Sequence, residues 1–448
     1  MAETRTSVTG EPRGPLCGMG ICFECRTASG ERTCQQGAPF AAGILPAEVS
    51  VLVVGAGPAG LAAARCAAES GASVALVDDN PAPGGQIWRS ETRAAPPATT
   101  VLCAARVIDF PRPGAATIEH AEQSFEIAYR SLVLATGARE RFLPFPGWTL
   151  PNVTGAGGLQ ALAKSGLVEV AGKRVVVAGS GPLLLAVADY LAGRGAEIRL
   201  IAEQAGTSAL LRFGFSLATR PAKLAQALRL RPARYLTACW PVTAHGKDKL
   251  EAVSLTRGTR TWREPCDFLA CGFGLIPNIE LPALAGCQLG LQGVLVDDHQ
   301  RTSVPGIYCA GEVTGIGGVD LSLVEGEIAG CAAAGHPEKA ARLFGRRERH
   351  RRFARALERA FPLREELRGL CQPDTLVCRC EDVPYGLVRE CAGWREAKLH
   401  TRCGMGPCQG RICGGALAFL LGWRAGSPRP PVYPARIASL SRPRCPQP

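Results

Sequence analysis

The sequence predicts an α/β protein built on parallel sheets, and three observations support this fold class. Short apolar runs alternate with Ala- and Leu-rich helix-like stretches over residues 49–335, which is the βαβ pattern. Two glycine-rich turns each follow an apolar run directly. Cysteines gather near both ends of the chain, within 17–34 and 378–413. We therefore expect two α/β halves with a small cysteine-rich module at each end.

Length, composition and charge fit a folded protein of several structural units. The chain has 448 residues, of which 46% are hydrophobic and 20% charged, and these values exclude global disorder. Much of the net charge of +12 lies in 342–355. This basic segment is either a docking surface for an acidic partner or anionic lipid heads, or a solvated helix face, and interleaved apolar residues at helical spacing favour the helix face. We expect no nucleic-acid partner.

The polar start and the cysteine content favour a reducing compartment. Residues 1–10 are polar, and no run approaches the ~18 apolar residues of a membrane span. We expect a cytoplasmic protein without a transmembrane segment, with peripheral contact to the inner membrane left open. Because disulfides are rare in such a compartment, the 20 cysteines are expected to hold metal where they cluster and to be buried apolar residues elsewhere.

Changes in composition divide the chain into five segments. They are a cysteine-rich segment (1–45), an α/β region (49–335) with a second half inserted at about 150–270, a basic helical linker (336–372), a second cysteine module (373–425) and a Pro-rich tail (426–448). We expect the tail to be extended or poorly ordered.

A complete dinucleotide-binding fingerprint begins at residue 51. Its parts are an apolar strand at 51–54, the turn Gly55-Ala56-Gly57-Pro58-Ala59-Gly60, a helix over 61–69 and a second strand at 73–77. Gly55 permits the tight turn, Gly57 lets a pyrophosphate approach the backbone, and Gly60 lets the helix pack on the strand. Asp78, with Asp79 as the alternative, is placed to hydrogen-bond a ribose hydroxyl.

Further elements favour FAD over NAD. They are Gly84-Gly85-Gln86 with Arg89, Thr136-Gly137 at the end of one strand, and Gly311-Glu312 at the end of a late strand. With these elements, residues 49–335 resemble the two-dinucleotide-binding-domain (Rossmann-type) flavoproteins that include thioredoxin and glutathione reductases. The resemblance implies noncovalently bound FAD, with the late acid contacting its ribityl chain. Glu312 stands where this family usually has Asp.

A second, altered fingerprint follows the strand at 174–178. Its turn carries Gly179 and Gly181, but Leu184 replaces the third glycine. A leucine there is expected to push the helix from the strand or to occupy space near the phosphates. Glu203, at the end of the next strand, keeps the position of the ribose acid. Three states of this site stay open: reducing NAD(P)H, a non-reducing adenine nucleotide, or no ligand.

The central region lacks two features that related chemistry would need. It has no CxxC motif, and Cys266 and Cys271 lie in an apolar run that we interpret as core. Flavin electrons are therefore expected to leave by a route other than an adjacent dithiol. We find no obvious general base for a substrate, so we assign no catalytic residue.

The N-terminal cysteines have the spacing of a plant-type [2Fe–2S] site. Cys17-x4-Cys22-x2-Cys25 provides three thiolates, and Cys34 is the fourth candidate. Zinc, a degenerate loop and reactive thiols are the alternatives. Only 16 residues precede Cys17, fewer than a plant-type domain needs. A truncated start, completion by a partner chain and a weakly held cluster are all open.

The C-terminal cysteines predict a second [2Fe–2S] site. Cys378 and Cys380 place two thiolates on one turn, and a later glycine-rich loop holds Cys403, Cys408 and Cys413. This pattern resembles the bacterioferritin-associated-ferredoxin-like module. We choose Cys408 and Cys413 as the other two ligands because they flank the turn into an apolar helix, and Cys403 is the reserve. Zinc is the alternative.

The modules in this order resemble the electron-transfer (alpha, A or B type) subunit of heteromeric FAD-dependent amino-acid dehydrogenases. Opine oxidase, D-hydroxyproline and L-proline dehydrogenases and hydrogen cyanide synthase belong to this group. The resemblance covers nearly the whole chain. It implies a partner subunit of the FAD-containing amino-acid oxidase type, which would select the amine (opine, hydroxyproline, proline or glycine), and a respiratory or artificial electron acceptor.

Two other functions stay open. A stand-alone NAD(P)H-dependent ferredoxin-type reductase needs nicotinamide at the second fingerprint, where Leu184 argues against it. A scaffold subunit, whose cofactors only stabilise an assembly, is compatible with the missing general base.

Overall fold

The computed structural model describes residues 5–27, 31–37, 40, 44–89, 91, 94–121, 123–217, 234–424 and 426–441. The chain forms two compact units from segments that alternate along the sequence. Unit 1 comprises Met1–Gln36, Glu140–Leu275 and Ala356–Gly426. Unit 2 comprises Gly37–Arg139, Ile276–Arg355 and Ser427–Pro448. Short strands β9 (Ala138–Glu140) and β18 (Leu275–Pro277) lie where the chain passes from one unit to the other.

Unit 2 is built on one seven-stranded sheet in the order β5-β4-β3-β8-β7-β6, with β19 beside β8. The strands are β3 (Glu48–Val54), β4 (Val74–Val77), β5 (Thr99–Leu102), β6 (Ala105–Asp109), β7 (Ala115–His120), β8 (Gln123–Leu134) and β19 (Ile307–Cys309). The β5, β4, β3, β8 and β19 strands run parallel, whereas β6 and β7 add antiparallel pairs. Near-continuous Val, Leu and Ala runs fit strands that are covered on both faces.

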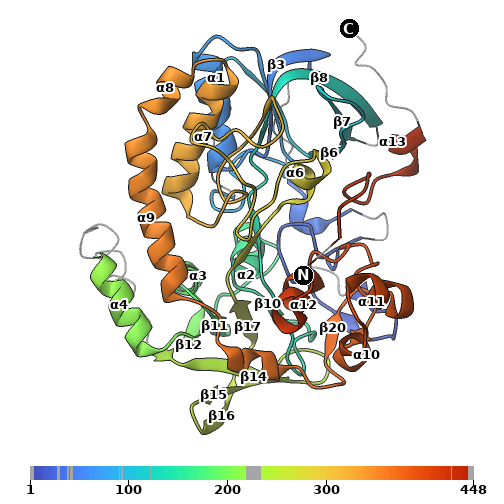
Figure 1. Ribbon diagram of the computed structural model, residues 1–448. Coiled ribbons are helices and arrows are strands. Elements are labelled where there is room, and N and C mark those ends of the chain that lie inside the picture. The colour runs from blue at the N-terminus through green and yellow to red at the C-terminus, as the bar shows by residue number, and fades with distance from the viewer. Residues whose placement is uncertain are drawn as a thin grey trace. The chain divides into compact units, whose positions relative to one another are not determined.

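Helices α1 (Pro58–Glu69) and α7 (Val319–Ala333) lie side by side in unit 2 (Figure 1). Their contact is a row of small residues, because a Cβ added at Gly326 or Gly330 would lie 2.1 or 2.2 Å from the carbonyl oxygens of Ala59 and Ala63. Among the described residues, this unit also contains α6 (Glu280–Leu284), α8 (Pro337–Ala341), most of α9 (Phe344–Ala360) and the short C-terminal α13 (Ile437–Ser441).

The basic segment forms α9, and three of its arginines pair with acids of unit 2. Arg346 pairs with Glu327, Arg347 with Asp298 and Arg351 with Glu325, at 3.0, 2.6 and 3.1 Å. These ion pairs support the helix-face interpretation of the segment over a docking surface. No helix in the described part of the chain is both long and apolar enough to cross a membrane.

The Pro-rich tail differs from its prediction over the part that the structure describes. The amide of Val432 donates to the Ile108 carbonyl oxygen at 3.0 Å, and the Ser124 hydroxyl donates to the Ser439 carbonyl oxygen at 2.6 Å. Val432 is buried, and helix α13 (Ile437–Ser441) follows. The tail is therefore packed on unit 2, because its isolated apolar residues fit beside β6 and β8. Residues 442–448 lie outside the described residues.

Unit 1 contains a five-stranded parallel sheet in the order β10-β17-β11-β12-β13. Its strands are β10 (Val153–Gly155), β11 (Arg174–Gly179), β12 (Glu197–Glu203), β13 (Tyr235–Thr237) and β17 (Phe268–Gly272). Helices α2 (Ala156–Lys164), α3 (Leu183–Gly193) and α4 (Thr207–Leu217) accompany it, and β14 (Cys239–His245), β15 (Ala252–Arg257) and β16 (Arg260–Pro265) form an antiparallel sheet. Cys266 and Cys271 are buried beside or within β17, as expected of core residues.

The cysteine-bearing segments also belong to unit 1. The first has β1 (Arg5–Thr6), β2 (Pro12–Arg13) and the short 3₁₀ helix η1 (Thr33–Gln35). The second has η2 (Glu365–Leu370), β20 (Leu376–Cys378), β21 (Val383–Pro384), α10 (Tyr385–Arg389), α11 (Trp394–Thr401) and α12 (Cys413–Leu421). Helices α10 to α12 gather around the short β20 strand in the red region of Figure 1.

Candidate cofactor sites

The first fingerprint turn contains three glycines. At two of them the surrounding protein leaves no room for a side chain, and at the third it does. A Cβ at Gly55 (φ +105°) would lie 2.2 Å from the Ala135 carbonyl oxygen, and one at Gly60 would lie 1.7 Å from the Gly55 carbonyl oxygen. At Gly57 the nearest atom to an added Cβ is the Gly85 Cα, at 4.0 Å. Gly57 therefore faces open space at the N-terminus of α1, where a phosphate can approach the backbone.

Asp78 is fixed beside this turn at the end of β4. Its carboxylate accepts hydrogen bonds from the Ala56 amide and from the amide and side chain of Asn80, the latter two at 2.7 Å. Burial, with a smaller contribution from Asp79, raises the pKa of Asp78 to about 6. Asp79 instead pairs with Arg106 at 3.2 Å. Of the two candidates, Asp78 is the one that the fold holds against the fingerprint.

The Gly84–Gly85 loop packs directly on the fingerprint. The Gly84 amide donates to the Ala56 carbonyl oxygen at 2.8 Å, and a Cβ at Gly85 would lie 2.9 Å from the Gly57 Cα. Arg89 then donates to Asn80 and Gln86 at 3.0 and 2.9 Å. The predicted residues Gly85, Gln86 and Arg89 are thus joined to the turn through a small polar network. Pro58 and Ala59 form the first turn of α1.

The predicted Thr136-Gly137 turn closes the end of β8. The Thr136 hydroxyl donates to the Asn278 carbonyl oxygen at 2.7 Å, and the Asn278 side chain donates back to the Thr136 carbonyl oxygen at 2.9 Å. Gly137 adopts φ +67°. Because β3 and β8 are neighbours, this turn lies at the same sheet edge as Gly55, as the fingerprint requires.

The late strand β19 brings Gly311 and Glu312 to that edge. Gly311 has φ +80°, and a Cβ there would lie 2.7 Å from the Ala59 Cβ on α1. Burial raises the pKa of Glu312, and the Gly318 amide partly offsets this effect. The predicted ribityl-contacting acid therefore sits in a turn packed against the helix that starts at the fingerprint.

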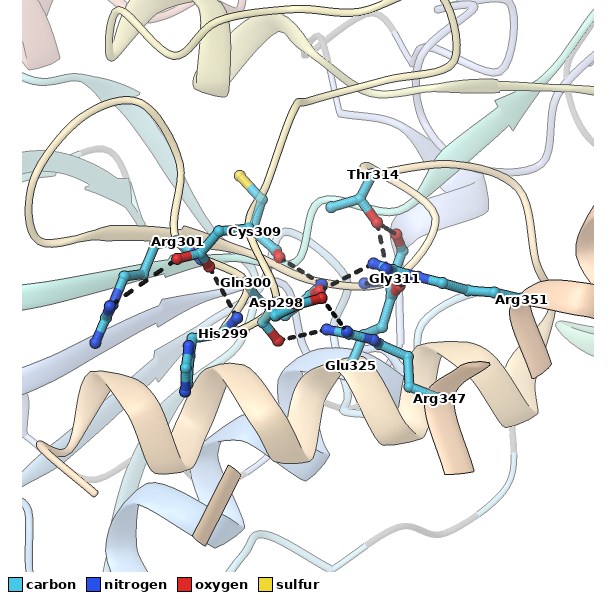
Figure 2. A network of polar contacts seen from close by, with 11 residues as sticks. Asp298, His299, Gln300, Arg301, Cys309, Gly311, Thr314, Glu325, Arg347 and Arg351 are labelled. Carbon is cyan, nitrogen blue, oxygen red and sulfur yellow. Dashed lines mark hydrogen bonds and ion pairs between the residues drawn. The ribbon is translucent and has the colours of Figure 1, made fainter. Parts of the chain in front are cut away.

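Sequence reasoning missed the residue that holds this turn, Glu325 of α7. Its carboxylate accepts from the Gly311 amide at 3.2 Å and the Thr314 hydroxyl at 3.0 Å, and it pairs with Arg351 at 3.1 Å. In Figure 2, Arg351 points toward both Glu325 and Gln300, and it donates to the side-chain oxygens of both. The available signal was an acid on an inward-facing position of a helix otherwise made of small and apolar residues.

The second fingerprint keeps its turn, and its acid is held by backbone amides as Asp78 is in the first. A Cβ at Gly179 (φ +137°) would lie 2.0 Å from the Gly272 carbonyl oxygen. Glu203 accepts from the Gly181 and Ala205 amides at 2.7 and 2.8 Å, and burial raises its pKa to about 7. Both carboxylate oxygens of Glu203 are thus used by the protein backbone, in a side chain that is fully buried.

Leu184 lies in the hydrophobic core of unit 1 and not beside the expected phosphates. It is fully buried, and a Cβ at Gly272 would meet its Cδ2 at 3.7 Å. Helix α3 accommodates the leucine by placing it between the strands and α2, because Gly272 and Ala156 leave room there. The expectation that this side chain occupies phosphate space is therefore wrong, and its effect is on helix packing.

A segment that follows α9 packs on the second fingerprint. The Gln204 side chain donates to the Pro362 carbonyl oxygen at 3.0 Å and accepts from the Arg364 amide at 3.1 Å. A Cβ at Gly181 would lie 3.9 Å from the Phe361 ring. We call Phe361–Arg364 the covering segment. It places an aromatic ring and main chain beside the Gly181 turn, a feature that local sequence pattern does not reveal.

The four N-terminal cysteines are all buried and form two contacting pairs. Cys17 contacts Cys22, and Cys25 contacts Cys34. The amides of Met19 and Cys22 point at the Cys17 sulfur, at 3.4 and 3.3 Å. Hydrogen bonding with Cys34 lowers the pKa of Cys25 to about 6. The arrangement offers two thiol pairs with backbone N–H groups turned toward sulfur, as expected from the glycine-rich loop.

The C-terminal site brings together five buried cysteines. The sulfurs of Cys378, Cys403 and Cys413 lie within 4.8 Å of one another. Cys380 contacts both Cys378 and Cys408. Cys403, the reserve ligand, therefore lies beside Cys378 and Cys413, while Cys408 lies beside Cys380. The Gly404 amide points at the Cys378 sulfur at 3.5 Å, and a Cβ at Gly406 would lie 2.2 Å from the Cys380 Cβ.

The central region of the chain matches a known protein family. The sequence profile of the pyridine nucleotide-disulphide oxidoreductase family matches residues 49–336, which contain both fingerprints. The chain belongs to this family. The predicted two-dinucleotide-domain flavoprotein fold is thereby confirmed, and the cysteine modules at its ends fall outside the matched range.

Relatives of similar length extend the comparison. An opine oxidase subunit of Agrobacterium tumefaciens (strain Ach5) is 32% identical over 87% of this chain and 91% of its own. The HcnB subunit of hydrogen cyanide synthase from Pseudomonas aeruginosa is 32% identical over 81% of this chain and 90% of its own. The chain is similar to both along most of its length, as the sequence motifs predict.

The fold is also similar to a solved structure, L-proline dehydrogenase from P. horikoshii. The TM-score is 0.68 at 20% identity, over 98% of this chain and 91% of that one. This similarity establishes the fold. With the family match and the glycine-lined turn at Gly57, it identifies the chain as an FAD-dependent oxidoreductase.

Replacing Gly57 by leucine is expected to remove FAD without unfolding the protein. The added side chain meets no protein atom nearer than 4.0 Å at its Cβ and fills the space that a phosphate needs. Flavin absorbance of the purified variant and its thermal unfolding measure the two effects. Gly60→Ala is the matched control, because its Cβ meets backbone and should destabilise the fold by about 1–3 kcal/mol. Full flavin content in Gly57→Leu would contradict the assignment.

FAD affinity is expected to weaken as the pH falls through about 6, the pKa of Asp78. Protonation removes the charged acceptor of a hydrogen bond from a ribose hydroxyl, and such a bond contributes about 1.5–3 kcal/mol to binding. The apo fold responds in the opposite sense. Because the folded pKa is raised, Asp78 stabilises the apo protein at low pH and this contribution is lost as pH rises through about 6. Titration calorimetry of FAD tests the first effect and denaturant unfolding of the apo protein tests the second, both across this pH range with Asp78→Asn as control. An unchanged pH profile in Asp78→Asn would refute them.

Proposed function

We propose that this chain is the electron-transfer subunit of a heteromeric amino-acid or amine dehydrogenase. It carries FAD and [2Fe–2S] clusters on its two cysteine sites, and a second FAD-containing subunit oxidises the C–N bond. The observation that carries the proposal is the presence of two sets of buried, mutually contacting thiols in a chain that also has an FAD-type glycine turn. The names of its relatives, one subunit of opine oxidase and one of hydrogen cyanide synthase, support a partner chain.

The N-terminal thiols fit a binuclear cluster. A [2Fe–2S] centre needs two thiolates on each iron, and the pairs Cys17–Cys22 and Cys25–Cys34 offer one pair for each. The amides at the Cys17 sulfur would stabilise the negative charge of a bound cluster. When bound, such a cluster accepts and returns one electron at a time. This chain holds its ligands buried, which excludes water from them.

The C-terminal thiols fit a second cluster, with one ligand to spare. Cys380 and Cys408 form one contacting pair, and two of Cys378, Cys403 and Cys413 would complete the other. The proposed set remains Cys378, Cys380, Cys408 and Cys413. A mononuclear zinc site would use the three clustered sulfurs instead, so metal analysis separates these alternatives.

The acids near the flavin turn support a relay function over direct substrate oxidation. Asp78, Glu312 and Glu325 each face backbone amides of neighbouring loops. These carboxylates hold the loops in place and are not aimed at an open substrate position. A substrate dehydrogenase needs groups that orient a carboxylate and an amine over the flavin. We therefore assign oxidation of the C–N bond to the partner subunit. This chain is assigned the delivery of electrons to a respiratory or artificial acceptor.

The second fingerprint argues against a stand-alone NAD(P)H-dependent reductase. The covering segment, held by Gln204, places the aromatic ring of Phe361 beside Gly181, whereas no aromatic ring lies within 4 Å of a Cβ added at Gly57. Gly179, Gly181 and Glu203 are proposed as a nucleotide-binding turn that takes, at most, a non-reducing adenine nucleotide. NADH is therefore expected to reduce the flavin poorly.

Cysteine substitutions test the C-terminal cluster. Cys408→Ser is expected to abolish or shift its EPR signal, because serine is a poorer donor and Cys408 lies beside Cys380. Cys403→Ser is the matched control and should leave the signal largely unchanged. Iron and sulfide content and EPR of the reduced protein are the measurements. Loss of the signal in Cys403→Ser with retention in Cys408→Ser would place Cys403 among the ligands.

Reconstitution tests the proposed function. The chain, loaded with FAD and iron, is assayed for dye reduction with proline, hydroxyproline, glycine and opines, alone and with its co-expressed partner. We expect turnover only in the complex, because this chain supplies cofactors but no substrate-orienting groups. Substantial dye reduction by the isolated chain with any of these substrates would place the active site here. Millisecond bleaching of its flavin by micromolar NADH would instead favour the reductase.

A further inference from the structure

The two cysteine sites of unit 1 are tied together by buried ion pairs between segments far apart in the sequence. Arg13 donates to Asp382 at 2.8 Å, with both side chains 3% exposed or less. Thr9 adds two hydrogen bonds to the same carboxylate, from its amide at 3.1 Å and its hydroxyl at 2.7 Å. Asp382 follows Cys380 by two residues, so the N-terminal segment packs directly on the loop that carries the CxC pair.

A second pair joins residues adjacent to ligand candidates of both sites. Arg379, between the two cysteines of the CxC pair, lies 3.5 Å from Glu24, which directly precedes Cys25. Their side chains are 2% and 1% exposed. Glu24 also interacts electrostatically with Cys22, and its other oxygen pairs with Arg5 at 2.9 Å. Each residue of this ion pair is therefore the direct sequence neighbour of a predicted cluster ligand.

Arg379 carries more positive charge than its protein partners neutralise. Its Nη2 donates to the Gly14 carbonyl oxygen at 3.1 Å and its Cζ lies 5.4 Å from the centre of the Trp148 ring, but its Nη1 is buried without a hydrogen bond. Burying a guanidinium with an unsatisfied nitrogen is costly unless negative charge lies nearby. A cluster held by four thiolates is such a charge, and it becomes more negative on reduction.

We propose that Glu24 and Arg379 are positioning residues that join the two iron–sulfur sites into one electron-transfer unit and make the C-terminal site the better electron acceptor. This inference rests on the proposed function, because it requires both clusters. Arg379 favours the reduced state of the cluster on its own loop, and Glu24 disfavours the reduced state of the cluster next to Cys25. One electron leaves the N-terminal site and one enters the C-terminal site, with no bond formed or broken.

The opposing pair, Arg13 and Asp382, has the reverse polarity but is better neutralised. Asp382 receives three hydrogen bonds, whereas Arg379 has a loose ion pair and one hydrogen bond. Positive charge at the CxC pair therefore comes from Arg379, and Arg5 adds to it through its electrostatic interaction with Cys380. The direction of transfer that follows, from the N-terminal to the C-terminal site, is fixed by charge placement and does not depend on the identity of the amine.

The experiment is an EPR-monitored redox titration of the full-length, iron-loaded protein, with the two signals assigned beforehand through Cys25→Ser and Cys408→Ser. Arg379→Gln should lower the midpoint potential of the C-terminal cluster and shift the equilibrium electron distribution by about tenfold or more toward the N-terminal cluster. Glu24→Gln should raise the midpoint potential of the N-terminal cluster. Arg379→Lys keeps the charge and should stay near the wild type.

Arg347→Gln is the matched control, since Arg347 is 4% exposed and paired with Asp298 in unit 2. It should lower thermal stability without changing the midpoint potential of either cluster. This control separates the general effect of losing a buried arginine from the loss of the Arg379 charge. Fully reduced wild-type protein should also show spin–spin interaction between the clusters. Two assembled clusters with no interaction, or with potentials unchanged in Arg379→Gln and Glu24→Gln, would overturn this inference alone. Absence of either cluster from the wild type would overturn the proposed function as well.

Discussion

The close approach of α7 to α1 is the constraint on which the flavin site depends. Backbone meets backbone at Gly326 and Gly330, so no side chain separates the two helices. This contact holds the first two turns of α1, at Ala59 and Ala63, directly against α7. It also places Glu325 under the Gly311 turn, where its carboxylate can accept from the Gly311 amide at 3.2 Å. A larger residue at either glycine would displace the turn and the acid together.

The fingerprint turns could be predicted because their determinants are local. The order strand, glycine turn, helix and acid specifies hydrogen bonds within about 30 residues, and Gly55, Gly60 and Asp78 lie as the pattern requires. Glu325 and the covering segment could not be found in this way. Glu325 lies only 14 residues from Gly311, but it belongs to no fingerprint, and its one signal was an acid in a helix of small and apolar residues. The covering segment lies more than 150 residues from Gln204, and nothing in the local composition marks that pairing. The tail was misjudged for the same reason, because Val432 is buried only against a distant strand.

The cysteine sites show the same division between local and distant determinants. Spacing in the sequence identified the nine thiols and the need for glycine between them. The choice of Cys408 and Cys413 over Cys403 stays a prediction, since the sulfurs of Cys403 and Cys413 both lie beside Cys378 while Cys408 lies beside Cys380. Likewise, nothing beside Arg379 or Glu24 in the sequence marks them as partners across most of the chain.

The assembly of unit 1 from three separate segments affects the timing of maturation during synthesis. The Arg13–Asp382 pair spans 369 residues, which takes on the order of half a minute to translate at roughly 5–20 residues per second. Until residue 382 has left the ribosome, the N-terminal cysteine loop lacks the surface that buries its neighbours. Its thiols pack near α2, which is made much earlier, so it is the side chains of Arg13 and Glu24 that wait for the later segment. Arg13 and Glu24 therefore reach their buried ion pairs only after the loop that carries Arg379 and Asp382 has been made, so unit 1 completes its packing late in synthesis.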